Sequence, residues 1–164
     1  MDALEALRGR RSVRVYDAKR PVTREQIETI VDCGRLAATA RNVQPWEFIV
    51  VTDPAVRASL AALAVNGPFI ADAPVCIAVT CQDGAYYLED GCNATQNLLL
   101  AAHALGLGSC WVAGDKKPYA GAVEELLGVP KGHRLVSLVA VGHAVSVPSP
   151  MKRPLAEVLH WEKF

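Results

Sequence analysis

The sequence lacks several features that would place it in a functional class at once. No apolar run approaches the roughly 20 residues that a membrane-spanning helix needs, and the N-terminus Met1–Glu5 lacks the basic-then-apolar layout of a signal peptide. Neither sign of charge is in excess, because 17 Lys and Arg residues balance 17 Asp and Glu residues. We therefore expect a cytoplasmic protein that binds neither membrane nor nucleic acid.

The usual patterns of metal and nucleotide sites are also missing. The five cysteines (Cys33, Cys76, Cys81, Cys92 and Cys110) are odd in number and form no CxxC pair, so we predict no metal site and no disulfide framework. There is no GxxxxGK[ST] loop. The nearest match to a dinucleotide fingerprint, Gly106-Leu107-Gly108, follows a predicted helix and precedes a predicted strand, which is the reverse of the required order.

Periodicity and capping residues indicate alternating helices and strands in one domain over residues 1–164. The predicted helices cover residues 2–7, 23–36, 53–63, 86–105 and 118–127, and the predicted strands cover 46–52, 74–80, 109–113 and 135–141. Such an order is typical of an α/β or α+β sandwich around a central sheet. The proline- and serine-rich residues after Val145 predict an extended arm over 145–164, with a disordered tail as the alternative.

A basic cluster opens the chain. The first 24 residues hold seven cations against only three acids, and the cations are Arg8, Arg10, Arg11, Arg14, Lys19, Arg20 and Arg24. A guanidinium matches a phosphate bidentately, and the Ser12 hydroxyl adds a donor beside it. The segment 10–14 is therefore either a phosphate-binding loop or a solvated basic loop.

Five separated motifs resemble, in content and order, the nitroreductase family of FMN-dependent oxidoreductases. They are Arg10–Tyr16, Asn42–Trp46, Asn97–Ala102, Gly106–Trp111, and Arg153–Leu155 ahead of His160-Trp161. The resemblance spans almost the whole chain. It implies an α+β fold of three layers, with a mixed, mostly antiparallel sheet flanked by helices. It also implies a homodimer with FMN at its interface, in which the arm 145–164 is exchanged between subunits.

The resemblance gives the opening motif specific roles. Arg10 and Ser12 would hold the FMN phosphate or ribityl chain, and Arg11 would be a further contact of the same kind. Arg14 would lie against the N1/O2 edge of the flavin ring, where a cation stabilises the reduced, anionic ring.

The asparagine motif is implied to act from the second subunit. Asn42 and Gln44 would hydrogen-bond the ribityl chain or the pyrimidine edge of the ring, and Thr39 keeps a hydroxyl where many relatives have Pro-Ser. The alternative for Gln44-Pro45-Trp46 is a turn with a core tryptophan, which we prefer for Trp46 itself.

Two further segments complete the implied FMN site. Backbone N–H groups near Ala113 and Gly114 would approach flavin N5, although relatives usually carry an acid where this chain has Ala113. Lys152 and Arg153 would complete the phosphate clamp, or else form an exposed basic pair.

These features predict an NAD(P)H-dependent FMN oxidoreductase. NADH or NADPH would deliver hydride to flavin N5, and a nitroaromatic, quinone or similar electron-poor small molecule would then accept it, with no catalytic side chain required. The alternative is a non-catalytic or regulatory flavin-binding protein of the same fold.

A few reactive side chains lie outside these motifs. We interpret His103 and His143 as structural, Cys110 as packing and Glu89-Asp90 as surface or interface charge. Tyr86 and Tyr87 line a pocket mouth or the core.

Overall fold

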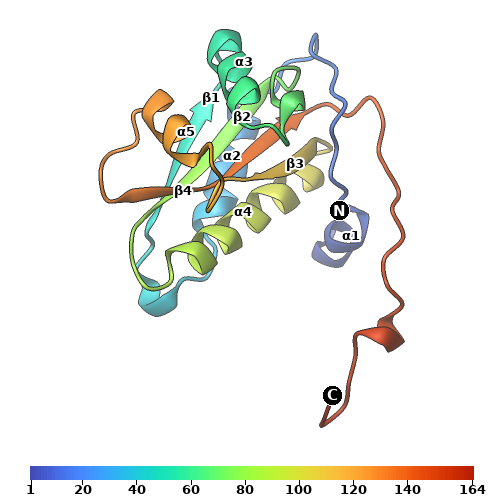
Figure 1. Cartoon of the computed structure of the whole chain (residues 1–164). Helices are drawn as coiled ribbons and strands as arrows, with labels where there is room; N and C mark the ends of the chain where they lie inside the picture. Colours follow the sequence, from blue (N-terminus) through green and yellow to red (C-terminus); the bar gives the residue numbers. More distant parts are fainter.

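The computed structural model describes residues 1–164, folded as a sheet between two layers of helices (Figure 1). Helices α2 and α4 cover one face of the sheet, and α3 and α5 cover the other. The elements are α1 (Ala3–Gly9), α2 (Arg24–Arg35), η1 (Ala40–Asn42), β1 (Trp46–Val51), α3 (Pro54–Leu63), η2 (Pro68–Ile70), β2 (Val75–Gln82), α4 (Tyr87–Ala104), β3 (Gly108–Ala113), α5 (Ala120–Leu126), β4 (His133–Gly142) and η3 (Leu155–Glu157). The predicted α+β class and helix order are confirmed.

Polar caps start the first three helices where the sequence predicts them. Asp2 and Thr23 each form a capping box with the residue three positions on, and the Asp53 carboxylate accepts the Ala55 and Val56 N–H groups. The apolar face predicted for α2 extends too far, however. The helix ends at Arg35, so Leu36 becomes its cap and is 64% exposed.

The sheet has the strand order β1-β2-β4-β3, and every neighbouring pair is antiparallel. The prediction of a mostly antiparallel sheet is confirmed, and no two named strands pair in parallel. The parallel pairing is confined to an isolated bridge between Ser12 and Ser109. Strands β2 and β4 are central and buried along nearly their whole length, as their apolar runs predict. Strand β3 is an edge strand, and this exposes one side of its backbone.

Helix α4 is the central helix of the chain. Leu98, Leu99 and Ala102 are buried where it packs on the sheet and against α2, and Trp46 joins the same core as predicted. The apolar 98–102 stretch is thus largely buried within one subunit. Its burial between subunits stays a prediction.

The residues after β4 run away from the body as an extended arm (Figure 1). The arm starts with the Val145 N–H donating to the Val15 carbonyl at 3.0 Å, after which every residue is exposed. Large apolar side chains lie along it, namely Val147, Met151, Leu155, Val158, Leu159, Trp161 and Phe164. None of the helices has both the length and the apolar character needed to cross a membrane.

Candidate functional site

The opening basic motif is held against the free edge of β3. The Val13 N–H donates to the Ser109 carbonyl at 2.9 Å, and the Tyr16 hydroxyl donates to the Val13 carbonyl at 2.6 Å. This close approach requires glycine at position 108, because a Cβ there would lie 2.9 Å from the Val13 side chain. The backbone of 12–14 is therefore fixed along an edge that the sheet itself leaves unpaired.

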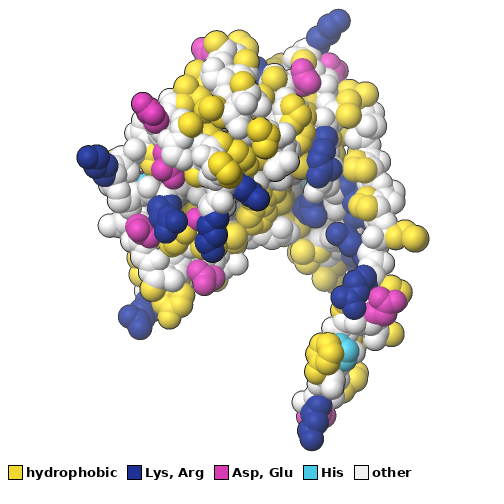
Figure 2. Space-filling model, in the orientation of Figure 1, with side chains coloured by type: hydrophobic (Ala, Val, Ile, Leu, Met, Phe, Trp, Pro, Cys, Tyr) yellow, Lys and Arg dark blue, Asp and Glu magenta, His cyan; other side chains and the backbone are white.

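A cavity of about 610 Å³ opens between this motif and the start of the arm. Figure 2 shows Lys and Arg side chains gathered in the gap between the body and the arm. The lining includes four cations and no carboxylate, and it consists of Arg10, Arg11, Ser12, Arg14, Pro148, Ser149, Pro150 and Lys152. Cations around a hydroxyl, with no acid among them, favour the binding of an anion.

The cations around the cavity differ in how many contacts they already make within the chain. Arg11 caps the end of α1, since its guanidinium donates to the Arg8 carbonyl at 2.7 Å and the Arg10 carbonyl at 2.9 Å. Arg14 lies 5.9 Å from the centre of the Phe69 ring. Arg10 has no carboxylate partner within the chain. Arg153 lies outside the cavity lining and pairs with Glu157 at 3.3 Å within the arm.

The loop that carries the asparagine motif is strained. Arg41, Asn42 and Gln44 have φ values of 55°, 57° and 54°, a left-handed conformation that costs an L residue on the order of 1–3 kcal/mol. Local hydrogen bonds hold the loop, because Gln44 Nε2 donates to Asn42 Oδ1 at 3.1 Å and the Gln44 N–H donates to Thr39 Oγ1 at 3.4 Å. Strain of this kind clusters at functional sites.

Asp90 anchors this loop from α4. Its side chain accepts the Ala40 N–H at 3.0 Å, and the residue is only 4% exposed. The interpretation of Asp90 as surface charge is therefore wrong. A buried carboxylate is tolerated here because it satisfies a backbone donor of the strained loop.

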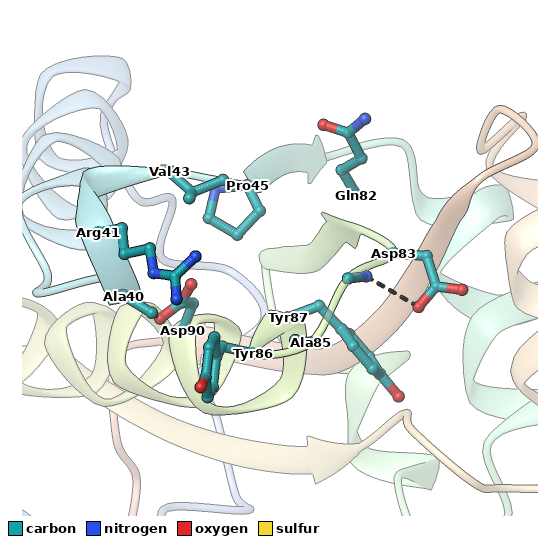
Figure 3. A pocket seen from close by; sticks show the side chains of 11 residues that line it. Ala40, Arg41, Val43, Pro45, Gln82, Asp83, Ala85, Tyr86, Tyr87 and Asp90 are labelled. Atoms are coloured by element: carbon teal, nitrogen blue, oxygen red, sulfur yellow. Dashed lines mark hydrogen bonds between the residues drawn. The ribbon is translucent and has the colours of Figure 1, made fainter.

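The structure does not bring the asparagine loop to the basic cavity of the same chain. Ala40, Arg41, Val43 and Pro45 of this loop instead line a second pocket of about 250 Å³, together with the 82–87 segment and Asp90 (Figure 3), whereas Asn42 and Gln44 are not part of the lining. Tyr86 and Tyr87 both lie on its wall, as the pocket-mouth interpretation predicts. Thr39, Asn42 and Gln44 thus lie apart from the basic cavity and from Arg10 on the same chain (Figure 1).

The end of β3 distinguishes the two predicted N5 contacts. The Gly114 N–H donates to the Val136 carbonyl at 3.0 Å and is committed to the sheet. Because backbone directions alternate along a strand, the Ala113 N–H points to the free edge. The Ala113 carbonyl on that edge accepts a hydrogen bond from the Tyr119 hydroxyl, whose pKa is raised by burial. Of the two residues, Ala113 offers the available N–H.

Comparison with known proteins assigns the chain to a family. The model of the nitroreductase family matches residues 7–74 and 61–143. The chain belongs to the nitroreductase family. This match includes the opening motif, the strained loop and the β3 edge, while the arm lies beyond it.

Individual nitroreductase relatives agree with the assignment. An archaeal protein provisionally named NADH dehydrogenase/NAD(P)H nitroreductase, from Methanothermobacter thermautotrophicus, is 33% identical over 100% of this chain and 88% of its own length. The NADPH-flavin oxidoreductase of Vibrio harveyi is 29% identical over 99% of this chain and 75% of its own. The structure of an FMN-dependent nitroreductase from Clostridium difficile R20291 superimposes with a TM-score of 0.92 at 26% identity, covering 98% and 99% of the two chains. The nitroreductase fold is therefore shown.

Sequence reasoning missed three polar residues near the β3 end of this nitroreductase chain. They are Tyr119, Asp115 and Arg134. The signal for Asp115 was its position directly after Gly114, at the end of a strand. Nothing in the sequence indicates that its partners come from α4 and β4.

Proposed function

We propose that this chain is an FMN-dependent oxidoreductase that uses NADH or NADPH as reductant. The basic cavity is the observation that carries the proposal, because its four cations and absence of acids suit a phosphate dianion. Arg10 and Lys152, which line the cavity, would pair with the phosphate, and the Ser12 hydroxyl would donate to phosphate or ribityl oxygens. Arg11 contributes charge mainly from its position at the end of α1.

The β3 edge extends this cavity toward a ring site. Ser12 pairs with Ser109, and Ala113 lies four residues further along the same strand, about 14 Å away at roughly 3.4 Å per residue. An extended ribityl phosphate with its ring matches this span. FMN held there would supply hydride-transfer chemistry at N5, between NAD(P)H and a second substrate in ping-pong order.

The residues of the chain would position and polarise that group. The free N–H of Ala113 would donate to N5, with its strand held by Tyr119 and by the Val136 carbonyl. The Arg14 guanidinium would lie at the N1/O2 edge, where it favours the anionic, reduced ring. Nitroaromatics, quinones and similar electron-poor small molecules are the proposed acceptors.

A second copy of the chain would complete the site. Thr39, Asn42 and Gln44 lie away from the basic cavity of their own chain, so they would reach FMN from a partner subunit. The exposed arm and an apolar groove of about 290 Å³ between α1 and α4 offer surface for that partner, including Leu7 and Leu100. An obligate homodimer would bury on the order of 2,000 Å² or more.

The proposal is tested by colour and its loss. Purified protein supplied with FMN should be yellow and should bleach when NADH or NADPH is added anaerobically in a stopped-flow instrument. Adding a quinone or a nitroaromatic should restore the colour. Yellow protein that neither nicotinamide bleaches would refute the enzymatic proposal and favour a flavin-binding protein without turnover. Protein that cannot bind FMN would refute both.

A further inference from the structure

A buried carboxylate lies two residues along the chain from Ala113, the proposed N5 contact. Asp115 follows Gly114 directly, and its side chain is only 8% exposed. The Tyr87 hydroxyl donates to Asp115 Oδ1 at 2.6 Å, and a guanidinium nitrogen of Arg134 lies 3.7 Å from the same oxygen. Lys116 Nζ approaches the other carboxylate oxygen at 3.9 Å from the solvent side.

The neighbours of Asp115 leave it little freedom to move. The Asp115 N–H shares the Val136 carbonyl with Gly114, at 3.2 Å. Arg134 also packs over the Tyr87 ring, with Cζ 4.6 Å from the ring centre. Burial, with the hydrogen bond to Asp115 second, raises the pKa of Tyr87 to about 12, so the hydroxyl remains a donor at neutral pH. The carboxylate is thus fixed two residues from Ala113.

The cluster joins three elements that are distant in sequence. Tyr87 begins α4, Arg134 lies in β4, and Asp115 lies in the turn two residues after the end of β3. The short hydrogen bond from Tyr87 fixes the position of the carboxylate, and the half-exposed Arg134 adds a longer ion pair from a second element. Such a fixed charge acts at a constant distance on whatever lies along the β3 edge.

We propose that Asp115 lowers the midpoint potential of FMN bound along the β3 edge, and that Tyr87 and Arg134 are the residues that position it. This inference rests on the proposed function. A fixed negative charge in a poorly solvated place disfavours the anionic reduced ring and barely affects the neutral oxidised ring. Asp115 would therefore oppose Arg14, and the balance between the two charges would set the potential.

The test is the midpoint potential of FMN in the holoprotein, measured anaerobically against a reference dye. Asp115→Asn keeps the shape and can still accept the Tyr87 hydrogen bond, so the potential should rise while the dissociation constant of FMN stays within about twofold. The matched control is Asp83→Asn, which removes the same charge from the same partner, since Arg134 lies 3.6 Å from Asp83. The Asp83 side chain is 56% exposed, so water should screen its charge and the potential should not change.

Tyr87→Phe supplies a second variant with no change in formal charge. It removes the hydrogen bond that fixes Asp115 in place, so the effect of the carboxylate should weaken and the potential should rise, by less than in Asp115→Asn. If Asp115→Asn fails to fold or to hold FMN, the Tyr87→Phe shift decides, and an unchanged or lowered potential overturns the inference.

Two other outcomes also overturn it: an unshifted potential in Asp115→Asn, or an equal rise in Asp83→Asn. Failure of the underlying function looks different, because wild-type protein would then bind no FMN or would not be bleached by NAD(P)H. If wild-type protein binds FMN and is bleached by NAD(P)H, an unshifted potential in the variant refutes only the role of Asp115.

Discussion

Replacing Arg10 with alanine separates recognition of the FMN phosphate from recognition of the ring. Arg10 lines the basic cavity and has no carboxylate partner to release on binding, so its guanidinium is free for the phosphate. A hydrogen bond to a charged group contributes about 1.5–3 kcal/mol. Arg10→Ala should therefore weaken FMN binding by about 10- to 150-fold at 1.4 kcal/mol per factor of ten.

The remaining cations limit the loss. Arg14 and Lys152 stay in the cavity, so the variant should still bind FMN and should not drop to the level of a protein without a phosphate site. The effect should also shrink as salt is added, because the lost interaction is electrostatic and the cavity is open to solvent.

The assay is fluorescence titration of FMN and of riboflavin, which lacks the phosphate. Riboflavin binding should change by less than about threefold, well below one 1.4 kcal/mol step. Arg24→Ala is the matched control, since Arg24 is an exposed arginine on α2 that pairs with Glu28 at 2.7 Å. Equal losses for the two ligands in Arg10→Ala would refute the assignment of Arg10 to the phosphate.

Three further outcomes are expected. Arg14→Met should change the dissociation constant of oxidised FMN by no more than about tenfold, or roughly 1.4 kcal/mol. It should lower the midpoint potential of the bound FMN and slow its reduction by NAD(P)H. An unchanged potential would mean that Arg14 does not face the ring. Truncation after Val145 should convert the proposed dimer to monomer in sedimentation and abolish tight FMN binding in titration, and a truncated monomer with full affinity would contradict the proposed shared site. The pKa of Tyr87, raised to about 12 from an unfolded value near 10, gives a stabilisation that is complete below pH 10 and lost as the pH rises toward 12. The free energy of unfolding in urea should therefore fall less between pH 10 and 12 in Tyr87→Phe than in the wild-type protein. Identical pH profiles for the two proteins would contradict the raised pKa of Tyr87.

Local sequence patterns predicted those structural features that depend only on residues close together in the chain. The capping boxes at Asp2 and Thr23 and the apolar run of β2 act over a few residues, so each could be recognised without knowing the tertiary fold. The basic cavity was also predictable in part, since Arg10, Ser12 and Arg14 lie within one short segment.

Contacts between distant segments were not predictable in the same way. Asp90 is buried because it serves the Ala40 N–H, which is 50 residues away in the chain. The Asp115 carboxylate is buried against Tyr87, which is 28 residues away. A single acid in a polar stretch has the pattern of surface charge, so only the fold distinguishes these residues from exposed ones. The prediction for Leu36 is wrong because its spacing fits the apolar face of α2, but the helix ends one residue earlier and leaves the side chain exposed.

The bridge between Ser12 and Ser109 bears on when the protein can acquire its cofactor. The basic cavity combines the opening motif, which β3 holds through Ser109, with residues 148–152 of the arm, so most of the chain separates its two sides. Contacts at such large sequence separation form after local ones, because the loop between them must close first. On the ribosome the arginines emerge early, yet their cavity cannot exist until the last strand and the arm have followed. FMN loading is therefore expected to be a post-translational event.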